Sequence, residues 1–298
     1  MPVRKLDGGL STALEANGNK LTSALWTGEL LRTAPKEIEK AHRDFVNAGA
    51  QIIITSAYQL SFSGCEARGW SKSDVISALN LSTELANSAA GDHGVQVAAS
   101  VGPYGASLAD GSEYRGRYAV SRSVLREFHK QRLDILIATQ PDILAIETMP
   151  DIEEVEVLLD LLDKSGSSIP FWVAYSCKEG EQTNAGQPFQ EAAQIVAERA
   201  HAIAVGVNCT PPELIAPLLR SAEHDFPYVI YPNAGREWDA SKKEWVGIPN
   251  GRFSSDLISE WIDLGAQIIG GCCGVSPRDI EAMEVTNPLR SHPRETIA

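Results

Sequence analysis

Eight short apolar stretches alternate with eight helix-like stretches along this chain of 298 residues. Short runs of apolar, β-branched or aromatic residues are typical of buried parallel strands, whereas apolar residues recurring every three or four positions are typical of amphipathic helices. The expected strands cover residues 3–7, 51–55, 95–101, 142–147, 171–175, 203–208, 228–231 and 268–271. The expected helices cover residues 35–48, 74–90, 121–139, 151–163, 189–200, 212–222, 255–264 and 277–285.

This alternation predicts an α/β fold. Eight strand–helix units over about this length are typical of a (β/α)8 barrel, also called a TIM barrel. A doubly wound open sheet is the alternative, but it rarely needs eight such units. No linker rich in Pro, Gly or Ser divides the chain, so we expect residues 1–298 to form one barrel domain, with 287–298 as a loosely held polar tail.

Charge and hydropathy argue against several classes of partner. The formal net charge is −13, and both nucleic acids and anionic membranes attract basic surfaces instead. No apolar run is long enough to span a bilayer, and the first residues lack an apolar signal segment. Five cysteines without the spacing of a disulfide framework indicate reduced thiols. We therefore expect a cytoplasmic protein that binds neither nucleic acid nor membranes.

Two adjacent cysteines, Cys272 and Cys273, follow the last expected strand and are flanked by glycines. Neighbouring strand residues point to opposite faces, so both thiols can serve one site only if the backbone leaves the strand there, which glycine permits. Adjacent thiols are poor disulfide partners, but together they can hold a soft metal. The alternative is a pair of small, buried and unreactive cysteines.

A third cysteine, Cys209, ends the expected strand at 203–208. Three thiols at the ends of two strands fit a catalytic zinc site, which takes three protein ligands and leaves one position open. A structural zinc site would need a fourth ligand, and no further cysteine or histidine lies close to these three in the sequence. The sequence therefore predicts Zn²⁺ on Cys209, Cys272 and Cys273. Cys65 and Cys177 are isolated, and their spacing assigns them no ligand role.

Other polar residues also follow expected strands, among them Asp7, Thr55, Tyr58, Glu147 and Asn233. The active site of a TIM barrel lies at this end of its strands. A buried carboxylate without a partner is costly, so Asp7 and Glu147 indicate a bound cationic group. The alternatives are a cap or turn role for Asp7 and a salt bridge for Glu147.

Gly8 and Gly9 follow Asp7 directly. Because glycine has no side chain, the backbone here can approach a ligand closely, and its amides could bind a carboxylate. The alternative is a tight turn without a ligand.

In combination, segments 7–9, 206–209 and 270–274 resemble the signature of the zinc-dependent homocysteine S-methyltransferases. The resemblance covers nearly the whole chain, in order. Segments 55–59 and 231–235 look closest to the branch that uses S-methylmethionine or S-adenosylmethionine as methyl donor. The compact length resembles that branch too, whereas the betaine-using branch is longer.

The resemblance implies a TIM-barrel enzyme of methionine biosynthesis, in which zinc on the three thiolates activates homocysteine to take a methyl group from a sulfonium donor. It also implies that Glu147 lies near the amino group of homocysteine and that the segment beginning at Asp7 lies near the substrate. No protein nucleophile beyond the metal site is required. We expect the substrate to be bound by Asp7, Gly8, Gly9, Thr55, Glu147, Asn208 and Asn233.

The methyl donor is expected to be S-methylmethionine, with S-adenosylmethionine accepted more slowly. Tyr58, Tyr104 and Trp172 are candidates to contact the donor, although core packing would suit them equally. The alternatives are a barrel enzyme that uses betaine or methylates another thiol or a selenol, and a non-catalytic barrel that binds methionine or a metal. We expect a monomer or a small homo-oligomer.

Overall fold

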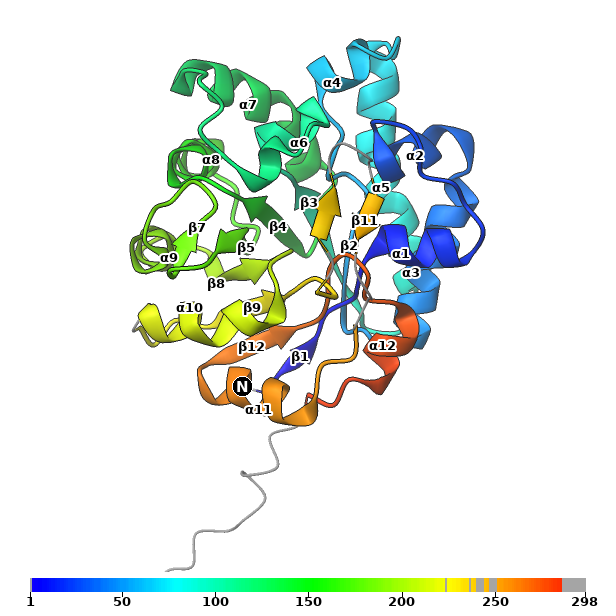
Figure 1. Cartoon of the computed structure of the whole chain (residues 1–298). Helices are drawn as coiled ribbons and strands as arrows, with labels where there is room; N and C mark the ends of the chain where they lie inside the picture. The colour runs from blue at the N-terminus through cyan, green and yellow to red at the C-terminus, as the bar shows by residue number, and fades with distance from the viewer. Residues whose placement is uncertain (1, 223, 236, 240–243, 247–250, 286–298) are drawn as a thin grey trace, which may run out of the picture.

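The computed structural model describes residues 2–285 except 223, 236, 240–243 and 247–250, and its centre is a sheet of eight parallel strands (Figure 1). The strand order in the sheet is β1-β12-β9-β8-β5-β4-β3-β2. These strands are β1 Arg4–Lys5, β2 Ile52–Ile54, β3 Gln96–Val101, β4 Ile143–Met149, β5 Phe171–Tyr175, β8 Ala202–Asn208, β9 Tyr228–Tyr231 and β12 Ala266–Ile269.

The first and last strands of that order meet and close the sheet. Leu6 forms a parallel bridge with Ile52, and the amide of Gln51 donates to the carbonyl of Lys5 over 2.7 Å. The sheet is therefore a (β/α)8 barrel, which confirms the fold expected from the sequence.

Helices surround the barrel on its outer side (Figure 1). The helices predicted from the sequence are observed as α3 Pro35–Asn47, α5 Lys72–Ala90, α7 Arg122–Ala138, α8 Ile152–Ser165, α9 Phe189–Ala197, α10 Ile215–Ser221, α11 Ser255–Asp263 and α12 Pro277–Ala282. In α3, for example, Pro35 occupies the first turn, and Ile38, Ala41 and Phe45 form the buried stripe.

Short elements in the connections were not predicted. The short helices are α1 Leu10–Ala16, η1 Trp26–Glu29, α2 Leu30–Thr33, α4 Phe62–Glu66, α6 Tyr104–Leu108, η2 Ser112–Tyr114 and η3 Pro212–Leu214. The short strands are β6 Cys177–Lys178, β7 Gln182–Thr183, β10 Glu237–Asp239 and β11 Glu244–Val246, paired as two antiparallel hairpins. Several of these elements lie in the connections that leave the carboxyl ends of the barrel strands.

The barrel interior is filled by side chains from alternate strand positions. Trp172 is fully buried there and shares the space with small neighbours such as Ala98 and Ala204. The same alternation places Ser100, two residues beyond Ala98, on the inner face, where its hydroxyl donates to Glu147. Polar groups thus replace apolar ones toward the carboxyl ends of the strands.

The tail predicted at 287–298 lies outside the described residues, and the one-domain assignment remains a prediction. Across the part of the chain that the structure describes, no helix combines the length and apolarity needed to cross a bilayer.

Candidate active site

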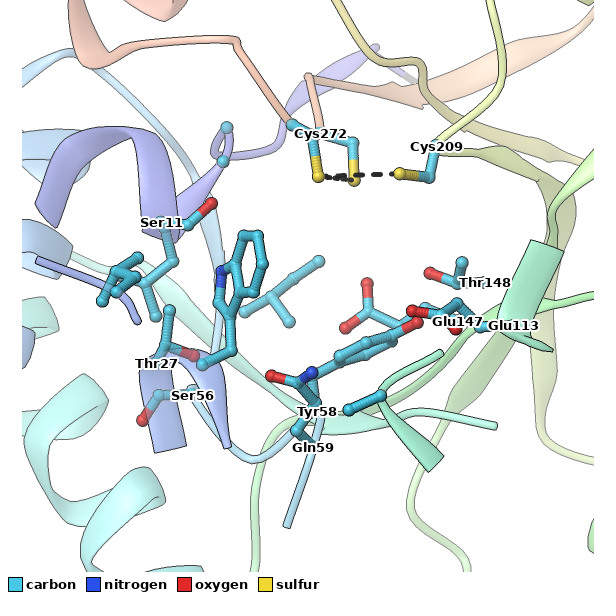
Figure 2. A pocket seen from close by; sticks show the side chains of 18 of the residues that line it. Ser11, Thr27, Ser56, Tyr58, Gln59, Glu113, Glu147, Thr148, Cys209 and Cys272 are labelled. Atoms are coloured by element: carbon cyan, nitrogen blue, oxygen red, sulfur yellow. Dashed lines mark hydrogen bonds between the residues drawn. The ribbon is translucent and has the colours of Figure 1, made fainter. Parts of the chain in front are cut away.

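A cavity of about 440 Å³ opens at the carboxyl ends of the barrel strands (Figure 2). Residues from strand ends and from the connections that follow them line it together. Its ionisable or sulfur-bearing lining side chains are Asp7, Tyr58, Asp110, Glu113, Tyr114, Glu147, Cys209, Tyr231, Cys272 and Cys273. No lysine, arginine or histidine is found among the described residues that line it.

The three predicted thiols meet at one wall of this cavity (Figure 2). The sulfur atoms of Cys209, Cys272 and Cys273 all lie within 4.8 Å of one another. Cys209 Sγ is 3.6 Å from Cys273 Sγ, and Cys272 Sγ is 3.9 Å from Cys273 Sγ. No other group of three or more potential metal ligands occurs in the described part of the chain.

A tight turn brings the two adjacent cysteines to the same side. β12 ends at Ile269, and the amide of Val275 donates back to the carbonyl of Cys272 over 3.1 Å. Gly274 has φ +85° in this turn, a conformation that suits glycine. At Gly271 a Cβ atom would lie 2.3 Å from the side chain of Val275, so only glycine fits there. The backbone therefore leaves the strand at the position where both thiols can face the cavity.

The thiols influence one another strongly. Hydrogen bonds from the other two cysteines, Cys272 first, hold the pKa of Cys209 well below its usual value. The pKa values of Cys272 and Cys273 are raised well above theirs, foremost by their hydrogen bonds to Cys209. One thiolate is thus stabilised by its neighbours, but three adjacent thiolates need a shared cation. This donor set fits a soft metal ion such as zinc.

Glu147 lies near the end of β4 and points into the cavity (Figure 2). Burial raises the pKa of this carboxyl to about 7, although hydrogen bonds from Ser100 and Tyr231 partly offset the effect. The nearby Cys209 raises it further. Since no cationic side chain shares the described lining, Glu147 is a desolvated acid that a bound cation would stabilise in its ionised form.

Asp7 also lines the cavity and is almost fully buried. Its Oδ2 atom accepts a hydrogen bond of 2.8 Å from the amide of Ile54. Burial, foremost, and the negative charge of Glu147 raise the pKa of Asp7 well above its usual value, while the Ile54 amide opposes them. The Ile54 contact ties β2 to the start of the chain, so Asp7 has a structural role as well as a place in the site.

Gly8 and Gly9 line the cavity. A Cβ atom on Gly9 would lie 2.7 Å from the carbonyl oxygen of Cys272, so the absence of a side chain lets this segment pack against the cysteine turn. The amide of Gly9, however, donates to the carbonyl of Val275 over 3.0 Å. That amide therefore holds the fold together and is not free to bind a carboxylate.

The remaining expected substrate residues divide into two groups. Thr55 lines the cavity, and its hydroxyl accepts from the amide of Ser100. Asn208 and Asn233 are buried and are not part of the cavity lining. Asn208 is bonded to Thr148 instead, and the side chain of Asn233 accepts from the amide of Gly235. Both asparagines thus shape the backbone at strand ends.

The three aromatic donor candidates also divide. Tyr58 lines the cavity. Trp172 fills the barrel interior, where its Nε1 atom donates to the hydroxyl of Tyr231 over 3.2 Å. Tyr104 packs against Tyr118 and Phe128 outside the cavity lining. Of the three, only Tyr58 is placed to contact a ligand there.

Two residues that line the cavity, Glu113 and Tyr114, were not predicted from the sequence. They belong to the short helix η2, in the long connection between β3 and α7. The hydroxyl of Tyr114 lies 3.2 Å from the sulfur of Cys209. Burial raises the pKa of Glu113 to about 7, and Cys209 raises it as well. The unusual length of this connection after a barrel strand was the available signal, because such loops often carry functional residues.

The chain is similar in sequence to known methyltransferases. Residues 5–286 match the family model described as homocysteine S-methyltransferase. Homocysteine S-methyltransferase 3 from Zea mays is 40% identical over 94% of this chain and 89% of its own length. Selenocysteine Se-methyltransferase from Brassica oleracea var. italica is 36% identical over 93% of this chain and 87% of its own.

A solved structure is similar over nearly the entire chain. The homocysteine methyltransferase MmuM from Escherichia coli, in its metallated form, superposes with a TM-score of 0.85 and 33% identity. The match covers 98% of this chain and 97% of that one.

Proposed function

This chain belongs to the homocysteine S-methyltransferase family, a family of methyltransferase enzymes, and from this premise we propose that its acceptor is homocysteine and its preferred donor is S-methylmethionine. The observation that carries the proposal is the convergence of three thiols and two buried carboxyls on one cavity without a cationic side chain in its described lining. Homocysteine brings a thiol and an ammonium group, and the donor brings a sulfonium, so the ligands supply the cations that the cavity lacks.

The reaction balances without a protein nucleophile. The homocysteine thiolate attacks the donor's methyl carbon, a new S–C bond forms, and the C–S bond to the sulfonium breaks. The bonding pair remains on the donor sulfur, which becomes a neutral thioether, and the proton of the acceptor thiol passes to solvent. With S-methylmethionine as donor, both products are methionine.

Cys209, Cys272 and Cys273 are the residues that would hold zinc. The bound ion would favour the thiolate form of a thiol that is otherwise mostly protonated at neutral pH, since a free thiol has a pKa of about 8.5. Three cysteine thiolates leave the site with net negative charge, which keeps the acceptor sulfur electron-rich and favours a cationic donor. Tyr114, 3.2 Å from the Cys209 sulfur, is positioned to orient that thiolate.

Glu147 would bind the ammonium group of homocysteine. Its carboxyl projects from β4 into the same cavity as the thiols (Figure 2). Hydrogen bonds from Ser100 and Tyr231 fix the carboxylate in place, so that little ordering is needed when the ligand binds. Asp7 lines the same cavity, where burial raises its pKa and a bound ammonium group would favour its ionised form.

The test is methionine formation by the purified, reduced and zinc-loaded protein. Homocysteine is paired in turn with S-methylmethionine, S-adenosylmethionine and glycine betaine, and kcat/KM is measured for each. We expect the order S-methylmethionine, then S-adenosylmethionine, with betaine inactive. A betaine rate equal to that of S-methylmethionine would contradict the donor assignment. If no methionine forms with any of the three donors, the proposed reaction is contradicted.

A second acceptor deserves its own assay, because one relative at 36% identity is named a selenocysteine Se-methyltransferase. A selenol has the same valence as a thiol and could enter the same site. Replacing homocysteine by selenocysteine, at fixed S-methylmethionine, measures the preference directly. We expect homocysteine to give the higher kcat/KM.

A further inference from the structure

Glu113 is a second glutamate that lines the cavity, and the role proposed for Glu147 does not account for its presence. Glu147 lies within β4, whereas Glu113 lies in the connection that follows β3, beyond the strand end at Val101. Figure 2 shows both carboxylates and Thr148 on one side of the cavity. The two acids therefore enter the cavity from different structural layers.

One oxygen of the Glu113 carboxylate is unpaired within the described part of the chain, although the residue's own backbone amide and the charge of Arg115 stabilise the carboxylate in part. Its Oε2 atom is buried and has no hydrogen-bond partner among the described residues. A buried carboxylate oxygen left unpaired destabilises the folded protein. An unpaired oxygen of this kind in a ligand cavity indicates a ligand that supplies the missing hydrogen-bond donor.

The backbone around Glu113 is firmly held, so the side chain is presented in a fixed place. The hydroxyl of Ser176 donates to the carbonyl of Glu113 over 3.2 Å. After Glu113 in the connection, the hydroxyl of Tyr118 donates to the buried carboxylate of Glu154 in α8 over 3.1 Å, and before Glu113 the amide of Tyr104 donates to the same carboxylate. The two contacts to Glu154 anchor the connection to α8 on both sides of Glu113.

The reaction needs two separate ammonium sites if both substrates are amino acids. Transfer requires the acceptor sulfur, the methyl carbon and the donor sulfur to lie in line. The two amino-acid chains then leave from opposite ends of that line, so a single carboxylate cannot pair with both ammonium groups. Glu147, within β4, is the more deeply buried of the two and suits the acceptor, whereas Glu113, in the connection, is only half-buried and suits the donor.

We propose that Glu113 binds the α-ammonium group of the methyl donor and thereby selects sulfonium donors that are amino acids. The inference rests on the proposed function, and it adds a specificity residue for the second substrate. Glycine betaine carries no such ammonium group and would leave Glu113 unpaired. When a ligand lacks the group that a buried polar side chain would bind, that side chain stays unpaired. Such a ligand is rejected more strongly than one that only makes fewer apolar contacts.

The experiment compares S-methylmethionine with its desamino analogue, 4-(dimethylsulfonio)butanoate, in the wild type and in Glu113→Gln. The analogue keeps the sulfonium and the carboxylate and lacks only the ammonium group. For S-methylmethionine, we expect the variant to lose about ten- to hundred-fold in kcat/KM, as for a lost charge-assisted hydrogen bond. For the analogue, variant and wild type should agree within about twofold, and the KM of homocysteine should stay unchanged.

Two further variants complete the design. Glu127→Gln makes the same chemical change at an exposed position on α7 and should alter neither donor's kinetics. Glu113→Asp keeps the charge and should recover part of the S-methylmethionine rate. It also serves as the test variant if Glu113→Gln melts at a lower temperature than the wild type.

An equal loss with both donors would overturn the proposal and make Glu113 a structural residue. A raised KM for homocysteine with unchanged donor kinetics would overturn it too, by assigning Glu113 to the acceptor. Failure of the proposed function would be distinct, because the wild type would then form no methionine from any sulfonium donor before the variants were compared.

Discussion

Asn208 and Thr148 form two hydrogen bonds that link β8 to β4. The amide of Thr148 donates to Asn208 Oδ1 over 2.7 Å, and Asn208 Nδ2 donates to Thr148 Oγ1 over 2.8 Å. Thr148 follows Glu147, and Asn208 precedes Cys209. The bridge therefore sets the position of the Glu147 carboxylate relative to the Cys209 thiol, across strands that are not adjacent in the sheet.

The backbone at this bridge is under strain. Thr148 has φ +57° and Cys209 has φ +48°, in the left-handed region that non-glycine residues rarely adopt. Trp26, which also lines the cavity, has φ +52°. Such conformations persist only where surrounding contacts enforce them, and they cluster at functional sites. The asparagine side chain is one of the contacts that enforce this one.

Asn208→Ala tests the bridge. The change leaves the buried Thr148 amide without its acceptor, so we expect the free energy of unfolding to fall by about 1–3 kcal/mol. We also expect kcat to fall, because Glu147 and Cys209 lose their common tether. Urea unfolding and steady-state kinetics measure the two effects. Thr148→Val is the milder comparison, since it removes the hydroxyl but keeps the hydrogen bond from the backbone amide of residue 148 to Asn208. An Asn208→Ala enzyme with wild-type stability would contradict this role.

Cys209→Ser tests the metal site. A hydroxyl is a far weaker ligand for a soft metal than a thiolate, so the variant should lose most of the roughly one zinc ion per chain expected for the wild type. Metal analysis of the purified, reduced protein gives the stoichiometry. Cys65→Ser is the matched control, because Cys65 is buried and lies outside the thiol cluster. Full zinc content in Cys209→Ser would remove this residue from the ligand set.

Glu147→Gln tests recognition of homocysteine. The amide keeps the shape of the side chain and removes its charge, which should weaken a buried charge-assisted hydrogen bond by about 1.5–3 kcal/mol. We expect a higher KM for homocysteine with zinc still bound. The measurement varies homocysteine at saturating S-methylmethionine, with metal content determined on the same sample. If the homocysteine kinetics are unchanged, Glu147 is a structural carboxylate.

His42 predicts a dependence of stability on pH. It is fully buried in α3, and neither ring nitrogen has a hydrogen-bond partner among the described residues. Burial lowers its pKa from 6.5 to about 4. Between these values the unfolded chain binds a proton that the folded chain does not, so stability falls as pH drops from about 6.5 to 4, by on the order of 3 kcal/mol.

His42→Leu removes this titration and the unpaired polar atoms. We expect its unfolding free energy to decline less steeply than that of the wild type between pH 7 and pH 4.5, as measured by urea unfolding at each pH. Taking the difference between variant and wild type cancels the contributions of the other titrating groups. Parallel curves for the two proteins would show that His42 does not contribute to the acid sensitivity.

The sequence by itself determined the barrel and the thiol cluster. Short apolar runs bounded by turn residues identify strands because a parallel strand is buried on both faces. Once eight strands are assigned, the closed parallel topology brings their carboxyl ends to one rim, so Cys209 and Cys272, 63 positions apart, were expected to meet there. The same reasoning placed Asp7 and Glu147 at that rim.

Only the tertiary structure decided which connections fold over that rim and which strand-end residues face the cavity. Tyr114 reaches the Cys209 sulfur, and Glu113 lines the cavity, because the connection that carries them is anchored to Glu154 through contacts that no local sequence pattern predicts. Asn208 was expected to bind substrate, yet its side chain is committed to Thr148. A hydrogen-bonding side chain has several possible partners within reach, and long-range packing decides which of them it binds. The burial of a strand, in contrast, can be predicted from the apolar character of consecutive residues.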